Sequence, residues 1–177
     1  MTSTMQQMMA TLPQIGRVTW IGLRTARRAP VDVVMAAEIN QQGLVGDFFN
    51  GPDGAPRAVT LIQAEHLLAI ASILDRESIA PELLRRNIVV AGINLKSLKH
   101  RQFQIGSAIL FATGNCAPCS FMEEQLGPGG YNAMRGHGGI TARVVQAGTI
   151  RIGDHVRLDD AGATLTPAVA AQADDRA

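Results

Sequence analysis

Short runs of apolar and β-branched residues, separated by glycines and polar turns, recur along the whole chain. They predict strands at Arg17–Leu23, Val31–Ala36, Ala58–Ile62, Asn87–Val90, Ala108–Thr113, Ala142–Gln146 and His155–Leu158. Phe103–Ser107 and Ile150–Asp154 share an apolar, polar, apolar, glycine, polar pattern, and each precedes an alternating run. Glycines at such positions are typical of tight turns or bends. The chain is therefore predicted to be mainly β.

Few segments show a helical period. In Gln63–Asp75 the apolar residues have the spacing i, i+3, i+4, i+7, at Leu67, Ile70, Ala71 and Leu74. Leu68 and Ile73 make this helix apolar nearly all round, which predicts that it is buried. A short helix is expected at Pro81–Leu84, because proline is favoured in a first turn. Since helices do not alternate regularly with strands, the pattern argues against a doubly wound sheet and favours a closed or nearly closed β-barrel with inserted helices.

Length and composition favour one domain. The chain has 177 residues, of which 46% are hydrophobic, enough to bury a core. We expect a flexible segment at residues 1–15, the domain at 16–158 and a disordered tail at 159–177, because both ends lack a sustained apolar period.

Charge and hydropathy exclude several functional classes. Lys and Arg number 16 and Asp and Glu 15, so no overall field attracts nucleic acid, and any basic site must be local. No run reaches membrane-spanning length, and the N-terminal residues lack the features of a signal peptide. The expectation is a cytoplasmic protein that binds neither nucleic acid nor membrane.

The candidate chemistry starts from Cys116 and Cys119, the only cysteines in the chain. Ser120 and Glu123 have the spacing of a capping box, which predicts a helix from about Ser120 to Gly127. Cys119 would then lie beside the positive end of this helix, where the ionised form of a thiol is favoured as a nucleophile or metal ligand. In a reducing compartment, such a pair is more typical of catalysis, redox chemistry or metal binding than of a structural disulfide.

The spacing of the two cysteines leaves alternatives open. A dithiol oxidoreductase is one, but the βαβ frame of thioredoxin-like proteins is missing upstream. Two inert buried thiols are another. A zinc site is less well supported, because there is no second cysteine pair and His100, His137 and His155 are not closely spaced.

Three further segments carry polar groups typical of an anion site. Arg85, Arg86 and Asn87 open an apolar strand, and arginine binds phosphate with two parallel hydrogen bonds. They could equally form a solvated charge cluster at a helix end. The segment Gly127–Gly139 contains six glycines, so its backbone must turn sharply or approach something closely.

Within that glycine-rich segment, Arg135 and His137 are placed to contact an anionic ligand, although the segment could also be only a mobile connection between strands. Asp47 and Arg57 flank the turn before a buried strand, where they either belong to a site or form an ion pair.

Read in order, these motifs resemble the MOSC domain family, the domain found at the C-terminus of molybdenum cofactor sulfurases. The resemblance covers about Gly16 to Leu158 and rests on Gly43-x-x-Gly46-Asp47, Arg57–Ile62, Arg85-x-Asn87-Ile88-Val89, Gly92-Ile93-Asn94, Ile105-Gly106, Cys119, Gly138-Gly139-Ile140 and Ile152-Gly153-Asp154. It implies a MOSC-type β-barrel, similar to the barrel of pyruvate kinase. It also implies that Cys119 carries transferred sulfur or binds molybdenum.

The resemblance further implies a set of cofactor-binding residues. Arg85 and Asn87 would hold the pterin or its phosphate, and further positions lie at Asp47, Arg57 and Asn94. Other donors for the cofactor phosphate would be Arg86, Arg135, His137, Gly138 and Gly139. Cys116 would assist Cys119 or serve packing alone.

The implied function is binding of the molybdenum cofactor, a thiophilic centre for which a thiolate is a suitable ligand. The protein would be either a carrier of cofactor or of persulfide sulfur on Cys119, or a molybdenum-dependent reductase of N-hydroxylated compounds. The long members of the family carry an additional N-terminal barrel segment, a ferredoxin-like module or a pyridoxal-phosphate domain, none of which this sequence shows. Electrons or sulfur would therefore pass to or from a separate donor or acceptor protein. The alternative is a thiol–disulfide protein that uses Cys116 and Cys119.

Overall fold

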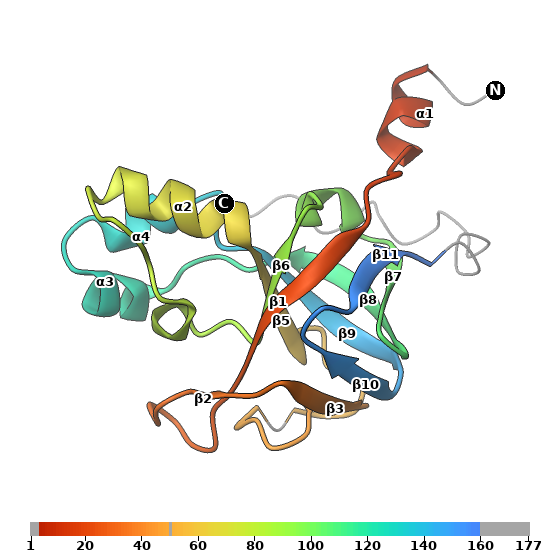
Figure 1. Ribbon diagram of the computed structural model, residues 1–177, viewed down its shortest axis with the longest axis horizontal. Helices are drawn as coiled ribbons and strands as arrows, with labels where there is room; N and C mark the ends of the chain where they lie inside the picture. The colour runs from red at the N-terminus through yellow and green to blue at the C-terminus, as the bar shows by residue number, and fades with distance from the viewer. Residues whose placement is uncertain (1–3, 50, 160–177) are drawn as a thin grey trace.

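The strands close into a mixed barrel because the first and last of them pair with each other. The computed structural model describes residues 4–49 and 51–159. Around the barrel, in hydrogen-bonded order, lie β11 (His155–Leu158), β7 (Gln102–Ile105), β8 (Ala108–Asn115), β9 (Ile140–Gln146), β5 (Val59–Gln63), β6 (Ile88–Ala91) and β1 (Gly16–Leu23). Strand β1 then pairs with β11, and β5 with β6 is the parallel pair among these neighbours (Figure 1). The predicted barrel with inserted helices is confirmed.

A second, three-stranded sheet lies beside the barrel. It consists of β10 (Gly148–Arg151), β3 (Ala36–Asn40) and β4 (Gly43–Leu44), while β2 (Asp32–Val33) extends the edge of β1. The prediction of a single strand at Val31–Ala36 is therefore wrong. Its first part pairs with β1 and its last residue begins β3, so the chain changes sheets between the two. The segments 103–107 and 150–154, predicted as turns, each contain the end of a strand before the turn.

Strands β5 and β6 are covered on both faces. Leu61, Ile88 and Val90 point into the barrel core, whereas Ile62 and Val89 point into a second apolar cluster beneath the helices. Alternate side chains of a strand face opposite sides, so a nearly continuous apolar run is what two buried faces require.

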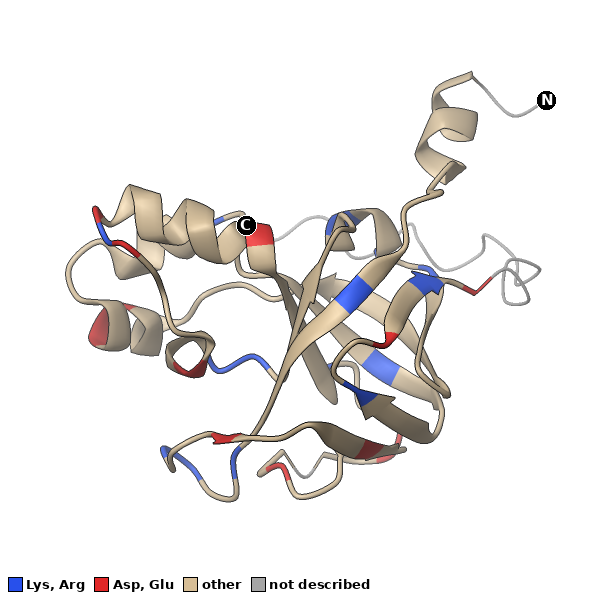
Figure 2. Ribbon diagram, in the orientation of Figure 1, with Lys and Arg blue, Asp and Glu red and all other residues tan. Residues whose placement is uncertain are grey.

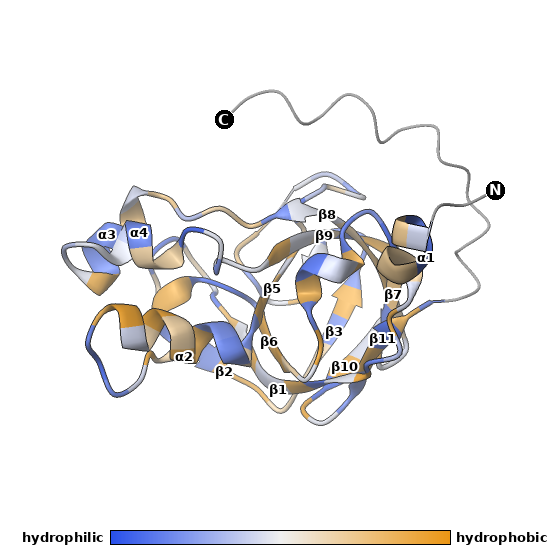
Figure 3. Cartoon of the chain, turned by 90° about the horizontal axis from the view of Figure 1, so that it is seen from above, coloured by the Kyte–Doolittle hydropathy of each residue, from blue (hydrophilic) through white to orange (hydrophobic). Residues whose placement is uncertain are grey.

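The helices lie mostly on one side of the barrel. They are α2 (Ala64–Ile73), the 3-10 helices η1 (Pro81–Leu84) and η2 (Leu95–Leu98), α3 (Ser120–Leu126) and α4 (Gly130–Met134). Figures 1 and 3 show α2, α3 and α4 together, away from β7, β10 and β11. At the N-terminus, α1 (Thr4–Ala10) has no buried residue. None of the described helices has the length and apolarity needed to span a bilayer.

Two predictions about the helices need correction. Helix α2 forms as expected, but it is not buried all round, because Leu68 and Ile73 are 67% and 57% exposed. Helix α3 begins at Ser120 and ends before Gly127 as predicted, but without a capping box: its N-cap is Cys119, which makes no side-chain cap bond.

The carboxylate of Glu123 caps the following turn instead of α3. It accepts hydrogen bonds from the backbone N–H groups of Gly129 (2.8 Å) and Tyr131 (2.7 Å), and these two bonds lower its pKa. The glycine-rich segment is therefore not an open loop, since it contains α4 and is fastened to α3.

Candidate functional site

Cys119 opens onto a hollow with an unusual charge. This hollow, called here the Cys119 hollow, has a volume of about 230 Å³ and is lined by Arg24, Phe49, Arg57, Thr60, Arg85, Arg86, Cys116, Ala117, Cys119 and Met122. Four of these residues are arginines and none is acidic. Cys119 is exposed and Cys116 is buried. The geometry brings one accessible sulfur together with a group of cations, which is an arrangement for an anion that carries a soft atom.

Arg86 is the structural centre of this group. Its guanidinium is buried and donates to three carbonyl oxygens, those of Gly138 (2.8 Å), Leu84 (2.8 Å) and Cys116 (3.1 Å). Burial lowers the pKa of Arg86, and the positive charges of Arg57 and Arg85 lower it further. The nearby thiols Cys116 and Cys119 act in the opposite direction and raise it. Arg86 therefore fixes the segment that carries the cysteines and contributes positive charge behind the cavity.

The segment before Cys119 is held from two sides. The Cys116 N–H donates to the Gly139 carbonyl (2.9 Å), and the Cys116 carbonyl accepts from Arg86. A Cβ on Gly138 would collide with that same carbonyl oxygen, so only glycine permits this close approach. The predicted Gly138–Gly139 pair thus positions Cys116 through its backbone.

Arg85 is held by local backbone geometry and by an aromatic ring. It caps η1 in the left-handed conformation (φ 55°), and its guanidinium lies 5.0 Å from the ring centroid of Phe121. Arg28, from the loop between β1 and β2, approaches the same ring at 5.2 Å. Figure 2 shows basic residues on this loop and on the segment before β6.

Arg24 is a site residue that the sequence analysis missed. Its Nη2 lies 3.5 Å from the Arg85 carbonyl oxygen, and its Nη1 is buried with no hydrogen-bond partner among the described residues. Burial lowers the pKa of Arg24, and the positive charges of Arg85 and Arg86 lower it further. The negative charge of Asp47 partly offsets this decrease. A buried donor without a partner is costly, so this nitrogen is suited to an acceptor from a bound ligand.

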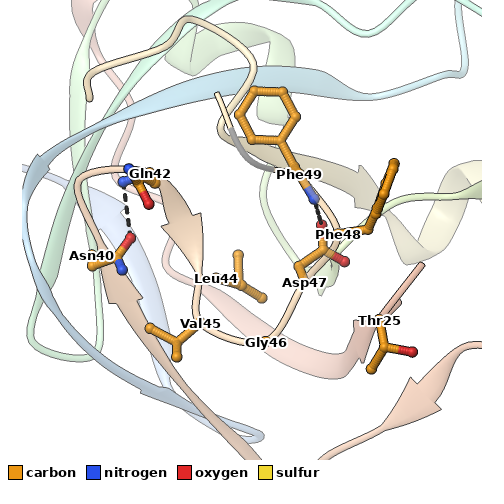
Figure 4. A pocket seen from close by; sticks show the side chains of 9 residues that line it. All are labelled: Thr25, Asn40, Gln42, Leu44, Val45, Gly46, Asp47, Phe48 and Phe49. Atoms are coloured by element: carbon orange, nitrogen blue, oxygen red, sulfur yellow. Dashed lines mark hydrogen bonds between the residues drawn. The ribbon is translucent and has the colours of Figure 1, made fainter. Parts of the chain in front are cut away.

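Asp47 supports the wall of the site from behind. Its Oδ1 accepts from the Arg24 N–H (2.9 Å) and its Oδ2 from the Phe49 N–H (3.3 Å), as Figure 4 shows for Phe49. Asp47 itself lines two neighbouring hollows of about 430 and 400 Å³. The larger shares Arg24, Phe49 and Arg85 with the Cys119 hollow, so the two adjoin.

Two predicted binding residues make structural contacts outside the Cys119 hollow. Asn87 is buried, and its Oδ1 accepts from the backbone N–H (3.1 Å) and the hydroxyl (2.8 Å) of Thr60, while its Nδ2 has no partner among the described residues. It therefore orients Thr60, which does line the hollow. Asn94 caps η2 by accepting from the Lys96 N–H (3.1 Å) and lines none of the hollows described here.

The remaining predicted residues lie away from the Cys119 hollow. Arg135, Gly138 and Gly139 line a hollow of about 330 Å³ on the other side of Cys116 and Ala117. His137 packs edge-on against His66, with ring centroids 5.2 Å apart. Of the residues predicted to bind the cofactor, Arg57, Arg85 and Arg86 thus line the same cavity as Cys119. The predicted residues of the glycine-rich segment do not line that cavity; they are Arg135, His137, Gly138 and Gly139.

Comparison with known proteins decides the family. The sequence profile of the MOSC domain matches residues 49–157, more than half of the chain. The chain belongs to the MOSC domain family.

Solved structures show the same MOSC fold at low sequence identity. The YuaD protein from Bacillus subtilis is 19% identical, with a TM-score of 0.72 over 82% of this chain and 97% of its own. The YiiM protein from Geobacillus stearothermophilus is 17% identical, with a TM-score of 0.68 over 84% of this chain and 77% of its own. The YiiM protein from Escherichia coli is 18% identical, with a TM-score of 0.62 over 81% of this chain and 69% of its own. A comparison with curated proteins found no match.

The MOSC family is associated with binding of the molybdenum cofactor. The described residues contain no group of three or more His, Cys, Asp or Glu side chains that could hold a metal ion by themselves. A metal that arrives with a dithiolene ligand of its own would need fewer protein ligands, and the exposed Cys119 would offer it a soft donor. The unpartnered Arg24 nitrogen and the neighbouring guanidiniums suit the anionic part of the same cofactor.

Proposed function

We propose that this protein binds the molybdenum cofactor in the Cys119 hollow, with the Cys119 sulfur as the protein ligand of the metal. The observation that supports this most directly is the accessible sulfur in a cavity lined by four arginines and no carboxylate. A strongly cationic cavity is stable only with an anion present or with water screening the charges. A phosphate-bearing, thiophilic cofactor satisfies both the guanidiniums and the sulfur.

Each residue has a separate task in this proposal. Arg24, Arg57 and Arg85 bind the cofactor phosphate, and Arg86 keeps the Cys116 backbone in place behind it. Phe49 and Met122 exclude water from the apolar side of the cavity. When bound, the cofactor supplies a metal that can accept an oxygen atom from a substrate.

Between reductase and carrier, the adjoining hollow favours the reductase. Its volume of about 430 Å³ offers room for a small substrate beside the cofactor, and Phe48 and Phe49 give it an apolar wall. Reduction of an N-hydroxylated compound consumes two electrons and two protons and yields the amine and water. The electrons would come from a separate donor protein, since no electron-carrying group is part of this proposal.

The test is cofactor analysis of protein produced in a host that makes the molybdenum cofactor. We expect about one molybdenum per chain in the unaltered protein, and loss of most of it in Cys119→Ser but not in Cys116→Ser, because only Cys119 is exposed. Arg85→Ala should lower occupancy about tenfold while the fold survives, because one charge-assisted bond to the anion is lost. Arg151→Ala, an exposed change on β10, is the matched control.

The same samples separate the rival functions. Molybdenum retained in Cys119→Ser would contradict ligation, and release of thiocyanate by cyanide from the unaltered protein would then identify a persulfide carrier. Protein without cofactor or persulfide, but with a Cys116–Cys119 disulfide of defined reduction potential, would establish the thiol–disulfide alternative.

A further inference from the structure

A second cationic cavity lies behind the cysteine segment. This cavity, called here the Lys96 hollow, has a volume of about 330 Å³ and is lined by Lys96, Asn115, Cys116, Ala117, Pro118, Tyr131, Arg135, Gly136, Gly138 and Gly139. It shares only Cys116 and Ala117 with the Cys119 hollow, so these two residues form the wall between the cavities. Its size falls within the range of small-molecule sites.

Among the described residues, the charged side chains that line the Lys96 hollow are all cationic. Lys96 and Arg135 line it, and no acidic residue does. Within the described ranges, neither cation takes part in an ion pair. A pair of cations around one concave surface favours a dianion over a neutral or monoanionic ligand.

The walls of this hollow are fixed in position. Glu123 accepts from the Tyr131 N–H and so fastens the start of α4 to α3. On the opposite side, Arg86 links the carbonyls of Cys116 and Gly138. Gly138 and Gly139 pack closely against the carbonyls of Cys116 and Leu61, which fixes this side of the hollow, whereas an added Cβ on Gly136 would lie 3.9 Å from the Lys96 Nζ. A rigid wall lowers the entropy lost on binding.

Tyr131 adds an aromatic surface at the edge of the hollow. Its side chain is 41% exposed although it lines the cavity. An exposed ring beside two cations suits a ligand with a flat ring attached to its anionic group, since the rings can stack while the anion is paired.

We propose that the Lys96 hollow is a second ligand site, which binds a phosphate monoester of a small ring compound. Lys96 and Arg135 bind the phosphate, and Tyr131 stacks on the ring. This site is separate from the proposed cofactor site and does not depend on it, because the cations of the two cavities are different residues.

Calorimetric titration with phenyl phosphate tests the proposal on the full chain. We expect a saturable event that persists in Arg57→Ala and has a Kd about tenfold higher in Lys96→Ala and in Arg135→Ala, because each of these two variants loses one charge-assisted contact. Any separate event in the Cys119 hollow should instead be weakened by Arg57→Ala. Tyr131→Ala should lower the affinity for phenyl phosphate but leave the affinity for inorganic phosphate unchanged. Phenol alone should not bind measurably.

Arg57→Ala is the control for the other cavity, because Arg57 lines the Cys119 hollow and not this one. Its affinity for phenyl phosphate in the Lys96 hollow should equal that of the unaltered protein. Binding that is lost in Arg57→Ala and unchanged in Lys96→Ala and Arg135→Ala would overturn the proposal, as would no saturable binding by the unaltered protein. Failure of the cofactor experiment would leave these results unaffected.

Discussion

Among individual residues, Arg86 has the largest structural role in the site. Three carbonyl oxygens from three segments of the chain depend on its guanidinium, which is 7% exposed. When one partner of a buried hydrogen bond is removed, the other retains its desolvation cost. The same side chain forms part of the wall of the Cys119 hollow and holds the wall of the Lys96 hollow through Gly138.

We therefore expect Arg86→Ala to lower the free energy of unfolding by about 2–3 kcal/mol, because buried carbonyl groups lose their donors. Arg57→Ala, an exposed arginine of the same cavity, should change it by less than about 0.5 kcal/mol. Urea unfolding followed by circular dichroism measures both. Equal effects of the two substitutions would mean that Arg86 does not act as a structural tether.

At the level of elements, one carboxylate adds hydrogen bonds to the apolar packing between α3 and α4. Glu123 is the acceptor for two backbone N–H groups at the start of α4, so each oxygen of its carboxylate has a separate donor. A neutral amide has only one acceptor oxygen and would keep only one of these bonds.

Because the two backbone bonds lower the pKa of Glu123 below its ordinary 4.5, its contribution to stability is present above that pH and is lost as the pH falls through the folded-state value. Glu123→Gln should therefore lower the Tm at pH 7, and the difference from the unaltered protein should shrink below pH 4.5. Scanning calorimetry across pH 2–7 checks this. The neighbouring Glu124→Gln is the control: Glu124 makes only an exposed ion pair with Arg28, and such pairs contribute little. A Tm difference for Glu123→Gln that does not vary with pH would contradict the cap.

The same element shows what local sequence patterns can predict. The bounds of α3 followed from Ser120 and from the Gly127–Pro128 stop, but the partner of Glu123 did not, because Gly129 and Tyr131 become available only when α4 folds back onto α3. Strands with strong apolar runs were predictable. Strand β3 was merged with β2, since a change of sheet leaves no mark in an apolar pattern.

The site was predictable to a similar extent. Four residues of the cavity could be recognised because they lie next to an apolar strand or a helix start, where a polar residue stands out from the apolar pattern. They are Cys119, Arg57, Arg85 and Arg86. Arg24 and Phe49 follow no motif, and their place in the cavity depends on the long-range contact through Asp47. The separation of Arg135 from Arg85 into two hollows likewise depends on tertiary structure, since Arg86 draws Cys116 and Gly138 together between them.

For the whole molecule, β5 and β6 join two apolar cores. Leu61 belongs to the barrel core and Ile62 to the cluster beneath α2, α3 and α4, and both are fully buried. The two clusters are therefore coupled through adjacent residues of one strand, while each can be perturbed by itself.

We expect Leu61→Ala and Ile62→Ala each to cost about 2–5 kcal/mol of unfolding free energy, the usual range for such cavities. Their local effects should differ. Hydrogen exchange should show faster opening of α2 and α4 in Ile62→Ala, and of the β8–β9 ladder in Leu61→Ala. Identical exchange patterns in both variants would mean that the two clusters open as one unit.

The pairing of β1 with β11 also has a consequence for chain connectivity. Gly16 lies opposite Val156, and Arg17 opposite His155, so the two ends of the barrel domain are already neighbours. A short peptide can join residue 158 to residue 16, and new ends can be opened between the exposed Glu77 and Ser78. In such a circular permutant β6 comes first and β5 last, and these parallel partners meet without any covalent crossover.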